Sequence, residues 1–258
     1  HDDIGWAITP EDTVHVPGMN AAMHRNFLAD FYNGSFPGSF ARGADFQSNP
    51  ETGDRRTNGS FASLAGLEQA LERGDTLLID MAVARILMGH ALIASFGGIP
   101  LIYMGDELGL LNDHSYLADP ELAEDGRWMH RPRMDWPMID ALDAGSPQAR
   151  ILSGTRSILH KRKAIAAFSA QVPTRIVDLG NPALFIFRRD AAANPVHCAF
   201  NFTETDQVVT PWGLGLAPGR DYTDLLSGRK LTLSDGMVRL APYQALWLAP
   251  LGQGGGLA

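Results

Sequence analysis

The strongest hydrophobic pattern in the chain predicts a long helix over residues 75–96. Gly97-Gly98 follows directly, and such glycines commonly end helices. Because Arg85 and His90 interrupt the apolar run, we expect a helix buried in a folded domain and not a membrane span. The apolar positions form one broad face and are Leu77, Leu78, Met81, Ile86, Leu87, Ala91 and Leu92.

A short, unbroken apolar run follows this helix and predicts a strand over residues 99–104. Its sequence, Ile-Pro-Leu-Ile-Tyr-Met, is typical of a strand that is covered on both faces of a parallel sheet. Asp106 and Glu107 come just after it, at the strand end where barrel folds carry their active sites. We favour a structural role for these two carboxylates, in which they support the start of the loop.

Two long segments, residues 7–72 and 108–144, lack clean periodicity and are rich in polar residues, Gly and Pro. Within the first, short helices are expected over residues 20–32 and 60–71. After the second, residues 146–165 read as a helix with a basic C-terminal end. Long loops in a compact domain are usually functional, so we look for binding residues in these segments.

The pattern changes near residue 172 to short β-forming runs separated by turns such as Gly180-Asn181-Pro182. Short strands at this spacing predict an all-β sandwich domain over residues 169–258. The runs cover residues 175–178, 183–187, 197–202, 207–209, 230–233, 237–240 and 245–248.

Composition restricts the possible partners. Of the 258 residues, 45% are hydrophobic and 19% are charged, which is typical of a packed globular protein. The formal net charge of -8 argues against a nucleic-acid partner, since phosphate binding requires clustered Lys and Arg. This composition suits a protein that acts on a neutral substrate, with no membrane partner.

Cys198 is the single cysteine and cannot form an internal disulfide. This favours the cytoplasm, or secretion without disulfides. The sequence has no Cys/His spacing of the kind that binds zinc, and we expect neither a metal nor another cofactor.

The first six residues, His1-Asp2-Asp3-Ile4-Gly5-Trp6, combine an imidazole with two carboxylates at the very start of the chain. Nothing precedes His1 that could form a strand, so we expect the chain to be the C-terminal part of a larger protein and to pack with its N-terminal part. The alternative interpretation is a disordered acidic end, which is common at termini.

Two motifs resemble the α-amylase superfamily. The segment 98–107, Gly-Ile-Pro-Leu-Ile-Tyr-Met-Gly-Asp-Glu, is similar to the eighth barrel strand of that family, Gly-x-Pro-x-x-Tyr-x-Gly-(Asp/Glu)-Glu. Residues 1–6 resemble the end of its seventh strand, where a His-Asp pair binds substrate. The doubled Asp followed by Ile-Gly-Trp is similar to amylosucrases and sucrose hydrolases.

The resemblance implies an α/β fold with two domains. Residues 1–168 would form the end of a (β/α)8 TIM barrel, comprising the end of strand 7, an inserted module over 7–72, helix 75–96, strand 99–104 and a final loop and helix. Residues 169–258 would form the C-terminal β-sandwich.

The resemblance also implies roles for the first residues. Asp2 would stabilise the positively charged transition state of a retaining glucosyl transfer, and His1 would hydrogen-bond glucosyl hydroxyls. A negative charge on Asp2 would also help to keep the acid/base protonated. The nucleophile and the acid/base of the family lie on earlier barrel strands, so neither is expected in this chain.

The other implied site residues bind substrate. Asp3 would act on the fructosyl side together with an arginine of the long insert, for which Arg56 is our choice. Arg25 and Phe27 would line an outer acceptor site. Arg131, in a segment that resembles Arg-Thr-Pro-Met-x-Trp, would close the glucosyl pocket. Without the resemblance, each arginine is most simply a solvated surface side chain.

The implied reaction starts from sucrose, releases fructose and transfers the glucosyl unit to an α-1,4-glucan, as in amylosucrase, without a cofactor. Transfer to water, as in sucrose hydrolase, is the alternative. A sucrose isomerase or α-glucosidase agrees less well with the Asp-Asp-Ile-Gly-Trp stretch. A hypothesis of another class is an inactive glucan-binding fragment that lacks the nucleophile and the acid/base.

Overall fold

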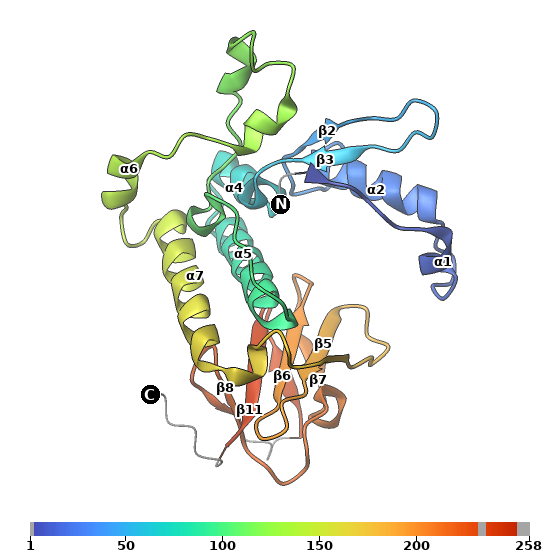
Figure 1. Ribbon diagram of the computed structural model, residues 1–258, viewed down its shortest axis with the longest axis vertical. Helices are drawn as coiled ribbons and strands as arrows, with labels where there is room; N and C mark the ends of the chain where they lie inside the picture. The colour runs from blue at the N-terminus through green and yellow to red at the C-terminus, as the bar shows by residue number, and fades with distance from the viewer. Residues whose placement is uncertain (1–2, 232–235, 252–258) are drawn as a thin grey trace. The chain divides into compact units, whose positions relative to one another are not determined.

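The computed structural model describes residues 3–231 and 236–251 (Figure 1). The chain divides into two compact units. The first unit runs to Val83 and resumes over Tyr103–Ile151, and the second contains Ala84–Ile102 and the residues from Leu152 onward. Two long helices, α5 (Thr76–Phe96) and α7 (Pro147–Ala164), contribute residues to both units. His1 and Asp2 lie outside the described residues.

The first unit is built from short elements. A three-stranded antiparallel sheet has the order β1-β3-β2. Its register aligns Asp3 with Asn58, and Asn58 with Ala44 on the other side. The elements are β1 (Asp3–Ile4), α1 (Pro10–Thr13), α2 (Ala21–Asn33), β2 (Ala44–Phe46), β3 (Arg56–Asn58), α3 (Phe61–Leu64), α4 (Leu67–Arg73), η1 (Asp106–Leu108), η2 (Ser115–Ala118), η3 (Gly126–His130) and α6 (Trp136–Asp140).

The two predicted helices of the insert form in different ways. The helix expected over residues 20–32 is confirmed as α2, which starts where the Asn20 side chain accepts the Met23 N–H at 3.0 Å. The helix expected over residues 60–71 is divided into α3 and α4. Gly66 separates them with a φ of 94°, a left-handed conformation that no continuous helix contains.

Residues 99–104 differ from the sequence prediction, because they form no strand in the structure. Ile99 is 92% exposed and Leu101 is 68% exposed. A strand requires hydrogen bonds to a neighbouring strand. Within residues 3–231 and 236–251, no strand pairs with this segment, and every strand pair is antiparallel. The helix before it, α5, ends at Phe96, as Gly97-Gly98 predicts.

The second unit contains an antiparallel β structure in two sheets. One sheet has six strands in the order β4-β5-β6-β11-β8-β9, and the other pairs β10 with β7. One of the strands, β8, has no counterpart among the predicted runs. The elements are η4 (Ala166–Phe168), β4 (Thr174–Ile176), β5 (Leu184–Arg189), β6 (Val196–Asn201), β7 (Gln207–Val209), η5 (Trp212–Leu214), β8 (Tyr222–Asp224), β9 (Lys230–Leu231), β10 (Val238–Leu240) and β11 (Ala245–Pro250).

The main core of this unit lies between the two sheets. Ile186, Ala199 and Leu246 are direct cross-strand neighbours on β5, β6 and β11. They belong to the same buried cluster as Val209 of β7 and Val238 of β10. Because side chains alternate along a strand, only every second residue of the large sheet contributes to this cluster.

The opposite face of the large sheet is also buried. Phe187, Cys198 and Trp247 form the adjacent cross-strand row on that face. Phe96 of α5 packs edge-on against Phe187 with ring centroids 5.2 Å apart, and Phe168 packs against Trp247 at 4.6 Å. The C-terminal end of α5 and η4 therefore cover this face, and β6 is buried at all of its positions.

Arg189 is the largest charged side chain of this interior, at 1% exposed. Its guanidinium donates to the carbonyls of Ala167 at 3.1 Å and Ser169 at 2.6 Å, to Thr174 Oγ1 at 2.5 Å, and to the carbonyl of Phe96. Burial lowers the pKa of Arg189. The bond to Phe96 satisfies a carbonyl at the C-terminus of α5, so one side chain joins the helix end to β4 and β5.

α5 is long and apolar enough to cross a membrane, with a mean hydropathy of 1.8. Several of its side chains are nevertheless interior, with Ala82 and Ile86 at 0% exposed and Ala94 at 1%. Leu77, Ile93 and Phe96 of the same helix are 61%, 41% and 44% exposed, so the burial of α5 is partial.

His90 makes the fold sensitive to acid. It is 1% exposed, with Nδ1 2.8 Å from Thr155 Oγ1, and burial lowers its pKa from 6.5 to about 4. The unfolded chain therefore binds more protons than the folded chain between these pH values, and stability falls as the pH drops through that window. The loss amounts to about 3 kcal/mol when complete.

We expect His90→Gln to reduce this pH dependence, because Gln has no titrating group and can still hydrogen-bond Thr155. Denaturant unfolding of both proteins at pH 7 and pH 4.5 measures the effect. Equal losses of stability in the two proteins would show that His90 is not the responsible group.

Candidate functional site

Two of the predicted sugar-binding residues, Arg25 and Arg56, line a cavity of about 280 Å³ in the first unit. We call it the arginine cavity. Segments far apart in sequence form its walls: the residues after β1, the helix α2, the loop between β2 and β3, and the start of β3. Its lining residues are Gly5, Trp6, Ala7, Arg25, Gln47, Asn49, Asp54, Arg55 and Arg56.

Trp6 fixes the wall that follows β1. Its indole N–H donates to Thr57 Oγ1 at 3.1 Å, and its ring stacks on Tyr32 of α2 with centroids 5.2 Å apart. Gly5 lies against Arg56, since a Cβ at this position would be 3.7 Å from Arg56 Nε. The segment that continues from Asp3 is therefore held against both β3 and α2.

Arg25 connects three parts of the cavity wall. Its Nε donates to Asp54 Oδ1 at 2.7 Å, and its Nη1 donates to the carbonyl of Ile8 at 2.7 Å. The hydrogen bond from Arg25 lowers the pKa of the Asp54 carboxyl. Asp54 is thus ionised at neutral pH and offers an acceptor oxygen beside the N–H donors of Arg25.

Arg55 is similarly compensated. It donates to Asp30 Oδ1 at 2.7 Å and to Asp45 Oδ2 at 3.1 Å, and the bond to Asp30 raises the pKa of Arg55. The charges of Arg25 and Arg55 are therefore balanced by neighbouring carboxylates. A wall of this kind offers hydrogen-bond donors and acceptors with little net charge, which suits a neutral polyhydroxyl ligand.

The structure brings together some of the predicted site residues. Arg25 and Arg56 line the same cavity. The backbone of Asp3 pairs with Asn58, two residues after Arg56 on β3. His1 and Asp2, the predicted sugar-binding imidazole and transition-state carboxylate, lie outside the described residues, as does the side chain of Asp3.

Phe27 and Arg131 are not among the residues that line this cavity. Phe27 is 38% exposed on α2 and contacts Phe31 and Phe36 in an aromatic cluster. The guanidinium carbon of Arg131 is 5.9 Å from the centroid of the Trp128 ring. Their predicted roles in sugar binding stay predictions.

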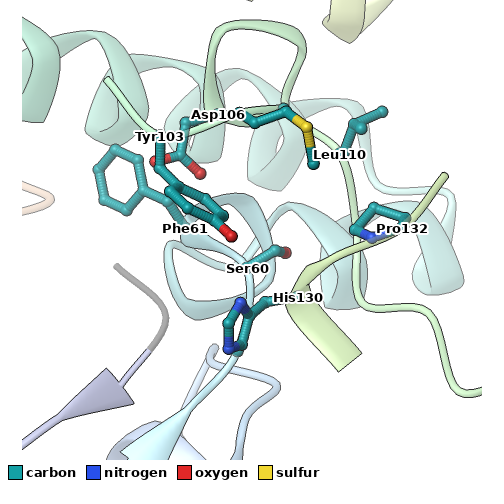
Figure 2. Close-up of a pocket in the computed structure, with 10 residues that line it drawn as sticks. Ser60, Phe61, Tyr103, Asp106, Leu110, His130 and Pro132 are labelled. Carbon is teal, nitrogen blue, oxygen red and sulfur yellow. The ribbon is translucent and has the colours of Figure 1, made fainter. Parts of the chain in front are cut away.

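A second cavity lies where Tyr103, Ser60 and His130 meet (Figure 2). The rings of Tyr103 and His130 are packed edge to face, with centroids 6.2 Å apart. The cavity measures about 10 Å³, roughly the space for one water molecule and far too little for a sugar. Nearby, Glu107 accepts the Gly105 N–H at 2.9 Å, which confirms the expected role of this carboxylate in supporting the loop.

Sequence reasoning missed three residues of the first unit. Trp6 and Asp54 line the arginine cavity, although the sequence singled out only the neighbouring arginines. Asn58 is 1% exposed, and its Nδ2 donates to the carbonyl of Gly126 at 2.7 Å, while its Oδ1 is buried without a hydrogen-bond partner. A signal for Asp54 existed in the run Asp54-Arg55-Arg56, but its pairing with Arg25 depends on the fold.

Among the residues that the structure describes, no group of three or more His, Cys, Asp or Glu side chains could hold a metal ion. Cys198 is a free, buried thiol, and burial raises its pKa.

Comparisons with known proteins match part of the chain to a family model and to a curated relative. Residues 174–249 match the family model of the amylosucrase C-terminal domain. The glucosylglycerate phosphorylase of Allomeiothermus silvanus is 27% identical over 173 residues, which are 66% of this chain and 27% of that protein. The chain thus spans about a quarter of the length of this curated relative.

Solved structures of AmyP share the fold over about two thirds of this chain. The crystal structure of AmyP in complex with maltose is 18% identical, with a TM-score of 0.51 over 67% of this chain and 36% of that chain. An α-amylase from Anoxybacillus is 21% identical, with a TM-score of 0.49 over 74% of this chain and 36% of that one. The matched C-terminal domain and the curated relative thus support a resemblance of this chain to the C-terminal portion of α-amylase-family proteins, glycoside hydrolase family 13.

Proposed function

We propose that the chain is the C-terminal portion of a sucrose-active, retaining α-glucosyl transferase of the amylosucrase type. The observation that carries this proposal is the arginine cavity, which Arg25 and Arg56 line together with Gly5 and Trp6, a few residues after the Asp2-Asp3 pair in the sequence. The match of residues 174–249 to the amylosucrase C-terminal domain supports it. In the intact protein, residues 1–168 would complete a (β/α)8 barrel, and the segment 99–104 would pair there as its eighth strand.

In the proposed reaction, the N-terminal part of the protein and this chain each contribute catalytic residues. A nucleophile and an acid/base in the N-terminal part would take the glucosyl unit from sucrose and release fructose. In this chain, Asp2 would stabilise the positive charge that develops on the glucosyl ring, and His1 would hold its hydroxyls. Arg131 would close the pocket around that ring. The glucosyl unit would then pass to the end of an α-1,4-glucan.

The arginine cavity would hold the fructosyl side. Asp3 and Arg56 would bind fructosyl hydroxyls, while the Arg25–Asp54 pair would form the outer wall. The balanced charges of Arg25 and Arg55 support a neutral ligand, because each guanidinium already has a carboxylate partner. An uncompensated cluster of arginines would instead favour a phosphate or a carboxylate.

Replacing Arg56 by Ala in the intact protein is expected to lower kcat/KM for sucrose by roughly 10- to 100-fold, because hydrogen bonds from a charged group contribute about 1.5–3 kcal/mol. Steady-state measurement of fructose release checks this. Arg239→Ala is the control, since this side chain is 72% exposed in the second unit and pairs with Asp206. An unchanged kcat/KM in the Arg56 variant would remove Arg56 from the site.

The function itself is tested by incubating the intact protein with sucrose alone and measuring fructose, glucose and insoluble glucan. Fructose in excess of glucose, with glucan formed, is the expected result. Equal fructose and glucose without glucan would establish a sucrose hydrolase instead. No release of fructose, with glucan still bound, would leave the inactive glucan-binding alternative.

A parallel incubation with inorganic phosphate addresses the relative named as a phosphorylase. Formation of glucosyl phosphate at the expense of glucan would overturn the proposed transfer to glucan. We expect glucan formation to be insensitive to phosphate, since the described arginines Arg25 and Arg55 are already engaged by carboxylates.

A further inference from the structure

A third cavity, of about 270 Å³, lies between α1 and the start of α2 in the first unit. We call it the apolar cavity. Pro10, Met19, Ala21 and Ala22 form much of its lining. Arg25 lines both this cavity and the arginine cavity, so the two spaces adjoin through a single side chain.

Several polar atoms around the apolar cavity make hydrogen bonds within the protein. The Thr13 hydroxyl donates to the carbonyl of Pro10 at 2.9 Å, and Asn20 Oδ1 accepts the Met23 N–H at 3.0 Å. Arg25 donates to Asp54 and to the carbonyl of Ile8. More than half of the lining residues are apolar, which favours an apolar group in this space.

We propose that the apolar cavity binds an aryl or alkyl group carried by the glucosyl acceptor. The proposal rests on the proposed function: an acceptor sugar would occupy the arginine cavity, and the substituent on its anomeric oxygen would pass Arg25 into the apolar cavity. In the transfer, the bond from the donor glucosyl C1 to the fructosyl oxygen breaks, and a bond from C1 to an acceptor hydroxyl oxygen forms. The acceptor proton ends on the released fructose.

Two acceptors that differ only in this substituent test the proposal, namely methyl and phenyl α-D-glucopyranoside. We expect the intact protein to bind the phenyl compound about tenfold more tightly, as measured by isothermal titration calorimetry, because the ring buries apolar surface. Equal affinities for the two compounds would overturn the proposal. This measurement needs no donor, so its outcome does not depend on sucrose being the substrate.

Variants of the cavity wall test whether the preference for the phenyl over the methyl glucoside arises in the apolar cavity. Ala22→Phe fills the cavity from α2, and Met19→Gln makes its wall polar, so each should reduce the tenfold preference to about twofold or less. Asn26→Phe adds the same ring as Ala22→Phe to the same helix, at an exposed position outside the cavity lining, and should keep the preference. A preference that survives both cavity variants would show that the phenyl group binds elsewhere.

A transfer assay with sucrose separates this proposal from the function on which it rests. The expected result is faster transfer to the phenyl acceptor than to the methyl acceptor, with fructose released in both cases. Absence of fructose release would refute the sucrose-active function, while the calorimetric preference and its loss in Ala22→Phe would still establish the cavity as a binding site for apolar groups.

Discussion

The intact protein carrying Asp2→Asn is expected to cleave sucrose about 10³-fold more slowly than the wild type while binding sucrose with nearly unchanged affinity. Asp2 would face positive charge that develops only in the transition state, so its loss affects kcat and leaves ground-state binding in place. The neutral amide has nearly the same shape, and the change therefore isolates the charge. Rates of fructose release and calorimetric binding of sucrose together provide the measurement.

The pH dependence of this variant adds a second test. A negative charge on Asp2 would help to keep the acid/base of the N-terminal part protonated, so the basic limb of the rate profile should move to lower pH in Asp2→Asn. Asp140→Asn is the matched control, because this carboxylate is exposed on α6 in the same unit. A kcat for Asp2→Asn within a few-fold of the wild type would exclude Asp2 from catalysis.

The largest expected effect on stability comes from Arg189→Met, which should lower the free energy of unfolding by about 3 kcal/mol. Methionine has a similar length but no donors, so four acceptors each lose one hydrogen bond, although the carbonyls of Phe96 and Ser169 keep a second donor. The carbonyl of Phe96 at the end of α5 is one of them. Removing a buried charge recovers some desolvation energy, and that gain keeps the loss below the sum of the four hydrogen bonds.

Denaturant unfolding, followed by near-ultraviolet circular dichroism of the aromatic core, measures the effect of Arg189→Met. Arg188→Met is a control from the preceding position on the same strand. Arg188 is 37% exposed and bonds to Asp190 at the surface, so its loss should be below about 1 kcal/mol. Arg189→Lys should fall between the two, since one ammonium cannot reach all four acceptors. Equal stability of Arg189→Met and the wild type would mean that the buried network contributes nothing net.

Periodic apolar patterns were sufficient for much of the fold. The α5 helix begins and ends within one residue of its predicted bounds, because its apolar face and the Gly97-Gly98 stop are local properties of the sequence. The β-forming runs after residue 172 correspond to strands of the second unit. The exception is β8, Tyr222–Asp224, which is not among the predicted runs and which pairs with β9 and β11.

Less of the candidate site could be predicted from the sequence. Arg25 and Arg56 were chosen by resemblance, and the structure places both on one cavity. The partner of Arg25 is Asp54, 29 residues away, and no periodic pattern predicts a contact between a helix and a loop at that distance. For residues 99–104 the sequence pattern indicates a strand that the structure does not contain. A strand forms only beside a neighbouring strand, and the described residues do not supply one for this segment.

The burial of β6 on both faces has a consequence for strand register. In a half-exposed strand, a slip by one residue would turn the apolar side chains to water, and this penalty sets the alignment. A strand buried at every position lacks that penalty. The alignment of such a strand must then come from groups whose hydrogen bonds are directional, and Asn201 at the end of β6 is one. Its Nδ2 donates to the carbonyls of Thr205 at 2.8 Å and Ala241 at 2.9 Å, while its Oδ1 accepts the Thr203 N–H at 3.0 Å. The Asn201 amide thus fixes the end of β6 relative to the following turn and to the residue after β10.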